Sequence, residues 1–107
     1  MNESTNNNLK CTIALAALHD VYDPEIGLNV VDLGLIYAIN FDEKDYRIDV
    51  SMTLTTQFCP MGESIVSNVT QALASVFQEY EVYVDLTFDP PWSYERISEE
   101  GQEYLNR

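Results

Sequence analysis

Apolar residues change their spacing twice between residues 47 and 88, and this change restricts the possible folds more than any other feature of the chain. Over residues 47–55 they alternate with polar residues, as in a strand with one buried face. From residue 60 to about residue 79 they recur every three or four positions, which is typical of an amphipathic helix. Over residues 81–88 they alternate again. The pattern therefore predicts a strand, a helix and another strand in succession.

Two earlier regions supply further predicted elements. Residues 35–41 are apolar at every odd position, which predicts a strand, and the polar turn 42–45 would join it to residues 47–55 as an antiparallel pair. The apolar odd positions of this strand are Leu35, Tyr37, Ile39 and Phe41. A helical stripe predicts a first helix near residues 9–22, which an Asp-Pro-Glu turn ends. Residues 28–34 can form a short edge strand or a loop.

The two ends of the chain lead to different expectations. Residues 1–8 are polar and have little to bury, so we expect a disordered leader there. Residues 9–107 are expected to form one domain, because cores usually divide only above roughly 250 residues. A short C-terminal helix is predicted, with Ser93 and Ser98 as candidate N-caps. The predicted fold class is α+β: a two-layer sandwich in which two to three helices cover a small, mainly antiparallel sheet of three to four strands.

The chain is strongly acidic, with 18 Asp and Glu against five Lys and Arg and a formal net charge of −13 at pH 7. Such a surface repels phosphate backbones and anionic lipids, so we expect neither nucleic acid nor a membrane as a partner. No segment approaches the roughly 18 consecutive apolar residues of a membrane span, and the N-terminus does not resemble a secretory signal. We therefore expect a cytoplasmic protein with less acidic protein partners.

Cys59 is the residue that most suggests chemistry, because it directly precedes a proline at the start of the predicted helix. At a helix N-terminus, unpaired amides and the helix dipole stabilise a thiolate, the form that binds metal. Thr55 and Thr56 could donate hydrogen bonds to the sulfur or to its ligand. The alternative is that Cys59 is a small buried hydrophobe. The other cysteine, Cys11, lies on the apolar stripe of the first helix and is expected to pack in the core.

An acidic cluster with one imidazole follows the first predicted helix. Its members are His19, Asp20, Asp23, Glu25 and Asp32. They could bind a hard cation or iron. We favour the alternative of a turn in which the Asp23 carboxylate accepts hydrogen bonds from nearby amides, because Pro24 breaks the helical spacing that a ligand pair would need. A hydrolase with Cys59 as nucleophile and His19 as base is another alternative, but nothing in the sequence places the two together.

Four short segments carry a resemblance to a known family. They are Asp23-Pro24-Glu25-Ile26, Val31-Asp32-Leu33-Gly34-Leu35-Ile36-Tyr37, Leu54-Thr55-Thr56-Gln57-Phe58-Cys59-Pro60 and Phe88-Asp89-Pro90-Pro91-Trp92. In order and spacing the chain resembles the SufT/PaaD-type iron–sulfur cluster assembly family, which has an FSCA-type domain. From the residues alone, Trp92 in the last segment could either pack the C-terminal helix or face a partner.

The resemblance implies a small α+β protein that matures iron–sulfur proteins without being an enzyme. It places the functional cysteine on Cys59 with Thr55 beside it, the acidic turn on Asp23 and Glu25, and a shared Asp-Leu-Gly triplet at Asp32. We therefore expect a homodimer that binds iron or an iron–sulfur cluster transiently and delivers it to client apoproteins, together with other assembly factors. The alternatives are a metal-free adaptor and an assembly protein dedicated to one metal-dependent oxygenase.

Overall fold

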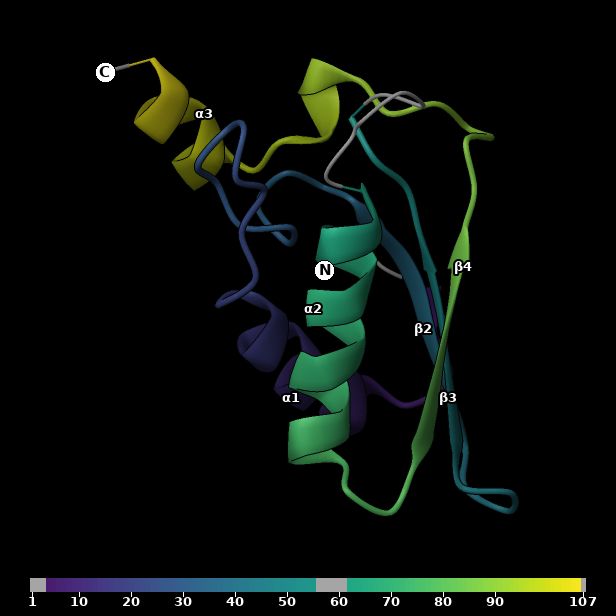
Figure 1. The fold of residues 1–107 in the computed structure, drawn as a ribbon. Helices are drawn as coiled ribbons and strands as arrows, with labels where there is room; N and C mark the ends of the chain where they lie inside the picture. Colours follow the sequence, from purple (N-terminus) through teal and green to yellow (C-terminus); the bar gives the residue numbers. More distant parts are fainter. Residues whose placement is uncertain (1–3, 56–61, 107) are drawn as a thin grey trace.

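The computed structural model describes residues 4–55 and 62–106. The helices are α1 (Asn8–Leu18), α2 (Gly62–Val76), α3 (Glu99–Leu105) and the short 3-10 helix η1 (Tyr94–Arg96). The strands are β1 (Ser4–Thr5), β2 (Ile36–Asp42), β3 (Arg47–Met52) and β4 (Glu81–Leu86). Figure 1 shows α1 and α2 on one side of the sheet and α3 beyond its end. The predicted α+β fold with two layers is therefore confirmed.

The directions of the strands differ from the prediction. The sheet has the order β1-β2-β3-β4. The β2–β3 pair is antiparallel, as predicted, whereas β1 runs parallel to β2 and β4 runs parallel to β3. The sheet is therefore mixed, and the expectation of a mainly antiparallel sheet was wrong. The physical reason is that α2 occupies the connection from β3 to β4 and returns the chain to the starting end of the sheet, so β4 runs in the same direction as β3.

Strand β2 contains an irregularity that overturns one predicted core position. Its register against β3 shifts between Ile36 and Ala38, which lie opposite Met52 and Ser51. Tyr37 is therefore an extra residue in the ladder, as in a β-bulge. Its side chain is only half-buried, whereas Ile36 is buried although it was not on the predicted inner face. The other three predicted positions, Leu35, Ile39 and Phe41, are buried.

The N-terminal segment is more ordered than predicted, because residues 4–8 are not a disordered leader. Ser4 and Thr5 form β1. The Asn6 side chain accepts a hydrogen bond from the Phe41 amide and donates one to the Phe41 carbonyl, both at 2.9 Å. The Asn7 side chain caps α1 by accepting from the Lys10 amide. Side-chain amides thus supply the hydrogen bonds that this polar segment needs to become ordered.

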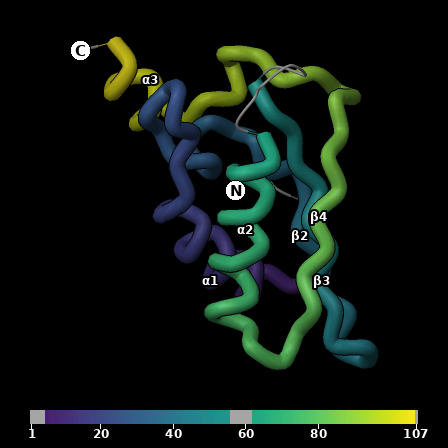
Figure 2. The backbone as a smooth tube through the Cα atoms, viewed as in Figure 1, coloured from purple at the N-terminus to yellow at the C-terminus, as the bar shows by residue number. Residues whose placement is uncertain are grey.

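Helix α1 ends at Leu18, about four residues before the predicted end. The Val21 amide still donates to the Leu18 carbonyl in a final turn, but Tyr22 then pairs with Asn29 in an isolated bridge and is exposed. Residues 28–34 form a series of turns and not an edge strand. In Figure 2 this segment follows α1 and passes close to α3 before the chain enters β2.

The remaining predicted elements are present with shorter bounds. Helix α2 begins at Gly62 among the described residues and ends at Val76. Strand β4 ends at Leu86, two residues before the predicted end. The C-terminal region is divided into η1 after Ser93 and α3 after Ser98, and only the Ser98 side chain makes a capping hydrogen bond, from the Gly101 amide. No helix in the described part of the chain is long and apolar enough to cross a membrane.

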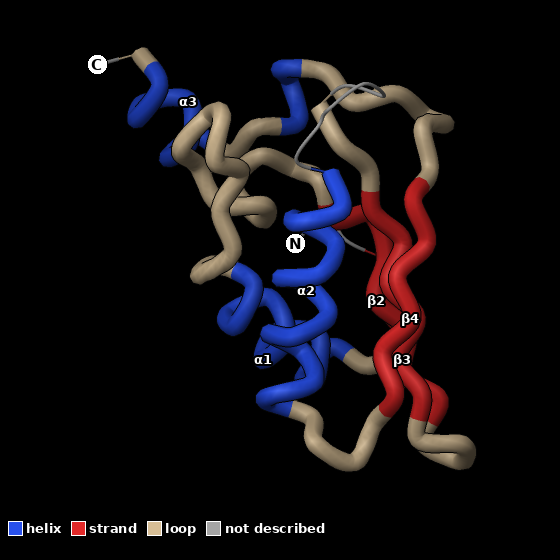
Figure 3. The backbone as a smooth tube through the Cα atoms, viewed as in Figure 1, coloured by secondary structure: helices blue, strands red, loops and turns tan. Residues whose placement is uncertain are grey.

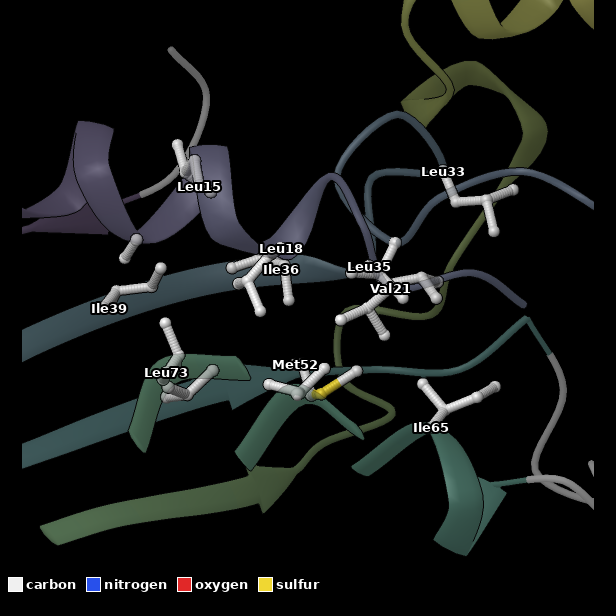
Figure 4. Close-up of a cluster of buried hydrophobic side chains, with 14 of the residues drawn as sticks. Leu15, Leu18, Val21, Leu33, Leu35, Ile36, Ile39, Met52, Ile65 and Leu73 are labelled. Carbon is white, nitrogen blue, oxygen red and sulfur yellow. The ribbon is translucent and has the colours of Figure 1, made fainter. Parts of the chain in front are cut away.

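The hydrophobic core lies between the sheet and the two long helices, which Figure 3 shows facing the strands. Leu18 of α1, Met52 of β3 and Leu73 of α2 are fully buried and point toward one another in Figure 4. Cys11 is also fully buried on α1, as its position on the apolar stripe predicted.

Candidate functional site

The segment that contains Cys59 connects β3 to α2. Thr56, Cys59 and the following proline lie outside the described residues, so their predicted roles remain predictions. The described residues on either side are the half-buried Thr55, which follows β3, and Gly62, which begins α2. The predicted position of Cys59 in the connection between a strand and a helix N-terminus therefore agrees with the elements that flank it.

An apolar hollow of about 460 Å³ lies beside the two ends of this connection. It is lined by Leu54, Gly62, Glu63, Val66, Ser67, Leu86 and Phe88. The first turn of α2 lies close to the loop after β3, because a Cβ atom at Gly62 would be 2.8 Å from the Leu54 Cδ1 atom. The described residues on both sides of the Cys59 segment thus border a surface that can receive an apolar group.

Asp23 organises the acidic turn and is almost inaccessible, with 1% of its surface exposed. Its carboxylate accepts a hydrogen bond from the Glu25 amide at 2.9 Å, and its carbonyl accepts one from the Gly27 amide at 2.8 Å. The Glu25 side chain is exposed. These contacts agree with the turn interpretation of the sequence, in which the Asp23 carboxylate satisfies local amides.

Asp32 joins the turns of residues 28–34 to the C-terminal helix. Its carboxylate accepts hydrogen bonds from the Asn29 side chain at 2.7 Å and from the Ser98 hydroxyl at 2.9 Å. The Asp32 carbonyl also accepts from the Ser98 amide at 2.8 Å. The His19 Nε2 atom lies 4.0 Å from the same carboxylate. One carboxylate oxygen of Asp32 therefore joins this turn to the distant Ser98, while the other bonds Asn29 within the turn.

Asn29 is a partner of Asp32 that was not among the predicted site residues. The Asn29 side-chain oxygen accepts from the Asp32 amide, while its nitrogen donates to the Asp32 carboxylate. This reciprocal arrangement over three residues is similar to a capping box, so the Asn-x-x-Asp spacing was the available signal. Ser98 was predicted only as an N-cap, and its second contact could not be read from local sequence.

The acidic residues do not form a metal centre within the described part of the chain. No three His, Cys, Asp or Glu residues there are grouped so that they could hold a metal ion. No hydrogen bond or ion pair in residues 4–55 and 62–106 connects Thr55 to Asp23, Glu25 or Asp32. The structure thus brings Asp32 to His19 and Ser98, and leaves Asp23 in its own turn. Their contacts indicate that both acids stabilise loops.

A second hollow, of about 490 Å³, lies where the Asp-Leu-Gly triplet meets the C-terminal segment. Gly34 has a φ of 74°, and a Cβ atom there would collide with the Arg96 backbone. The Arg96 guanidinium lies 4.4 Å from the centre of the Tyr37 ring. Trp92 is half-buried and donates to the Leu33 carbonyl at 2.6 Å, so it packs against this loop. This contact is with the loop of residues 28–34, which neither of the two alternatives for Trp92 had named.

Comparison with known proteins identifies the family. The family model described as "Iron-sulfur cluster assembly protein" matches residues 13–86, which include the acidic turn, the Asp-Leu-Gly triplet and Cys59. The chain belongs to this iron–sulfur cluster assembly family. The resemblance to SufT-type proteins that the four sequence segments suggested is therefore confirmed.

Proteins from three bacteria are similar to the chain along most of its length. "Fe-S protein maturation auxiliary factor YitW" of Bacillus subtilis is 36% identical over 98 residues, which are 92% of this chain and 90% of that protein. "Fe-S protein maturation auxiliary factor SufT" of Staphylococcus aureus is 38% identical over 73% of this chain and 88% of its own. A solved DUF59 domain of Bacillus anthracis has a TM-score of 0.83 and 38% identity, and the match covers 89% and 90% of the two chains.

Proposed function

We propose that this chain acts in the maturation of iron–sulfur proteins, and that it binds iron or an iron–sulfur cluster transiently through Cys59 and delivers it to client apoproteins. The observation that carries the proposal is the family match over residues 13–86, which includes Cys59 in the connection from β3 to α2. Two similar proteins are named Fe–S protein maturation auxiliary factors, which supports the same role here.

The chemistry of the cargo explains why the binding would be transient. A cluster of two or four irons normally takes four protein thiolates, and one Cys59 for each chain cannot supply them, even in a dimer. We therefore expect the other iron positions to be filled by a second subunit, a small thiol or the recipient protein. Delivery would then be a ligand exchange, in which a client thiolate replaces the Cys59 thiolate on iron and no atom changes its oxidation state.

The other parts of the proposal follow from the same role. The chain would carry its cargo without catalysing a reaction, in the cytoplasm, and in contact with client apoproteins and other assembly factors. A homodimer would provide two Cys59 thiolates for one cluster. Thr55 and Thr56 would donate hydrogen bonds to the cysteine or its ligand, and Asp23, Glu25 and Asp32 would support the loops around the site. Light scattering at several protein concentrations would test the dimer separately from metal binding.

A metal-free adaptor is the second candidate function. The apolar hollow lined by Leu54, Val66 and Leu86 favours the adaptor function. This hollow lies beside the described residues that flank the Cys59 segment, and a partner protein could bind there without iron. If the protein is an adaptor, the wild type and the Cys59→Ser variant should capture assembly proteins equally well. A carrier would lose its cargo with that substitution.

Anaerobic reconstitution with iron and sulfide tests the proposal, followed by counts of both for each chain. We expect wild-type protein and Cys11→Ala to retain iron and sulfide, and Cys59→Ser to retain none above a buffer control. Cys11→Ala is a matched control, because it also removes one thiol but from a fully buried position on α1. If wild-type protein retains no iron, or if Cys59→Ser retains as much as the wild type, Cys59 is not the carrier.

A further inference from the structure

Strand β4 forms an edge of the sheet and pairs only with β3 among the described strands. The amides of Glu81 and Thr87 donate to the carbonyls of Tyr46 and Met52, both at 2.8 Å, on the side of β3. Because successive residues of a strand point their backbone groups to opposite sides, the N–H and C=O groups of Val82, Val84 and Leu86 face the open side. No hydrogen bond within the described part of the chain covers these groups.

The side chains of β4 divide into an acidic face and an apolar face. Glu81 and Asp85 are exposed on the outer face, together with Tyr83, whose hydroxyl donates to Glu81 at 2.7 Å. Val82 and Val84 are half-buried on the other face. Leu86 is 44% exposed and lines the apolar hollow with Val66 and Phe88. An added strand would therefore meet acidic side chains on one face and apolar side chains on the other.

A second copy of this chain is a poor occupant of this edge. Antiparallel self-pairing centred on Tyr83 would place Glu81 directly opposite Asp85 of the other copy. Centring on Val84 makes the same two acids diagonal neighbours, and centring on Asp85 places the two Asp85 residues opposite each other. Like charges at such positions are destabilising, and each copy also has a net charge of −13. The acidic residues therefore oppose edge-to-edge association of the protein with itself.

We infer that the free edge of β4 binds, as an added antiparallel strand, an extended segment of a partner protein in which basic and apolar residues alternate. Its basic side chains would lie beside Glu81 and Asp85, and its apolar side chains would lie beside Val84 and Leu86. This inference goes beyond the proposed function and needs no iron. It would give a strongly acidic protein a surface for binding less acidic partners.

Synthetic peptides test the inference on the intact chain, so no variant has to fold for the first experiment. The probe is a capped peptide of eight alternating lysine and valine residues, titrated in low salt while the backbone amide signals are followed by NMR. We expect the largest shifts at Val82, Val84 and Leu86, and binding about tenfold weaker or more for a peptide of alternating glutamate and valine. Added salt should weaken the binding of the lysine peptide to the protein.

N-methylation provides a control with unchanged charge. In an antiparallel pair, the valines opposite Val82, Val84 and Leu86 exchange backbone hydrogen bonds with β4, whereas the lysine amides face away. A peptide N-methylated on its valines should therefore bind about tenfold more weakly or worse, and a peptide N-methylated on its lysines should keep most of its affinity. Equal affinities of the two methylated peptides would overturn the inference, because they would show that charge alone drives binding.

Charge-reversal variants of the protein test whether the acidic residues of β4 select the basic peptide. The variant with Glu81→Lys and Asp85→Lys should bind the lysine peptide about tenfold more weakly and should favour the glutamate peptide. A variant with Asp20→Lys and Glu103→Lys changes the net charge equally at exposed residues outside β4 and should bind the lysine peptide nearly as the wild type does. Equal losses in the two variants would contradict the inference. Concentration-dependent protection of the Val84 amide without peptide would also contradict it, because the occupant would then be a second copy.

Discussion

The turn around Asp32 and the edge strand β4 use acidic residues in opposite ways. Both carboxylate oxygens of Asp32 accept hydrogen bonds within the chain, one from Asn29 in the same turn and one from the distant Ser98. On β4, Glu81 and Asp85 point outward, and the backbone groups on the open side have no partner within the described residues. The acidic residues behind the net charge of −13 therefore do not share one structural role. Some of these acids hold loops together, and others are available to a partner.

Among these substitutions, Gly34→Ala should most strongly disrupt the packing of the turn around Asp32 against the C-terminal segment. The substitution puts a side chain at a φ of 74° and drives its Cβ atom into the Arg96 backbone. We expect the free energy of unfolding to fall by about 3 to 4 kcal/mol, measured by urea denaturation. Gly27→Ala is the matched control, because Gly27 has a similar φ of 81° but a Cβ atom there would meet only an ordinary van der Waals contact, with the Tyr104 hydroxyl at 3.8 Å. It should cost about 1 to 2 kcal/mol. Equal losses would show that the close contact with Arg96 is unimportant.

Proline substitutions in β4 should distinguish its paired side from its open side. The Tyr83 amide faces β3, so Tyr83→Pro removes a hydrogen bond of the ladder and should cost about 3 kcal/mol of unfolding free energy. The Val84 amide faces the open side, so Val84→Pro should cost only about 1 kcal/mol, from lost packing. Thermal and urea denaturation measure both. If Val84→Pro is the more damaging substitution, the assignment of the open edge is wrong.

Alanine substitutions compare the two kinds of acid directly. Asp32→Ala leaves the Asn29 side-chain nitrogen and the Ser98 hydroxyl without their acceptor and should lower the free energy of unfolding by about 2 kcal/mol. Asp85→Ala removes an exposed carboxylate of β4 and should change the free energy of unfolding by no more than about 0.5 kcal/mol. Urea denaturation at neutral pH would measure the difference. A loss for Asp85→Ala as large as that for Asp32→Ala would remove the distinction between the two regions.

Glu43 is an intermediate case, since it is exposed but paired. A hydrogen bond from Lys10 at 2.9 Å lowers the pKa of the Glu43 carboxyl, and bonds to Tyr80 and then Glu43 raise the pKa of Lys10. Because its folded pKa is lowered, Glu43 stabilises the protein above its unfolded pKa, and this contribution disappears as the pH falls through the folded pKa. Glu43→Gln should therefore cause a small loss of stability at pH 7 that vanishes in acid. A loss of stability that grows as the pH falls would contradict the lowered pKa of Glu43.

Apolar spacing predicted the buried faces better than it predicted strand directions. It placed Ile48, Val50 and Met52 on the inner face of β3, where they are buried. It could not show that β4 runs parallel to β3, because the same alternation suits either direction. It also missed the bulge at Tyr37, which depends on how the two strands pair and not on either sequence alone.

The contacts that sequence reasoning missed mostly join distant segments. Asn6 orders the N-terminal segment by bonding Phe41, and Asp32 bonds Ser98 across the loop region. Neither pair has a local pattern that would identify it. The turn at Asp23 was predictable, because an aspartate before proline commonly accepts bonds from the amides that follow. Cys59 was identified from its place before a helix and from the family resemblance, and its role remains a prediction.

Cluster transfer tests the central claim that Cys59 carries iron or a cluster to other proteins. Anaerobically reconstituted protein would be mixed with a metal-free [2Fe–2S] ferredoxin, and the visible absorption of the ferredoxin would be followed over time. We expect wild-type protein and Cys11→Ala to restore the ferredoxin faster than iron and sulfide alone, and Cys59→Ser to give only the rate of the free ions. Transfer by Cys59→Ser at the wild-type rate would contradict the claim.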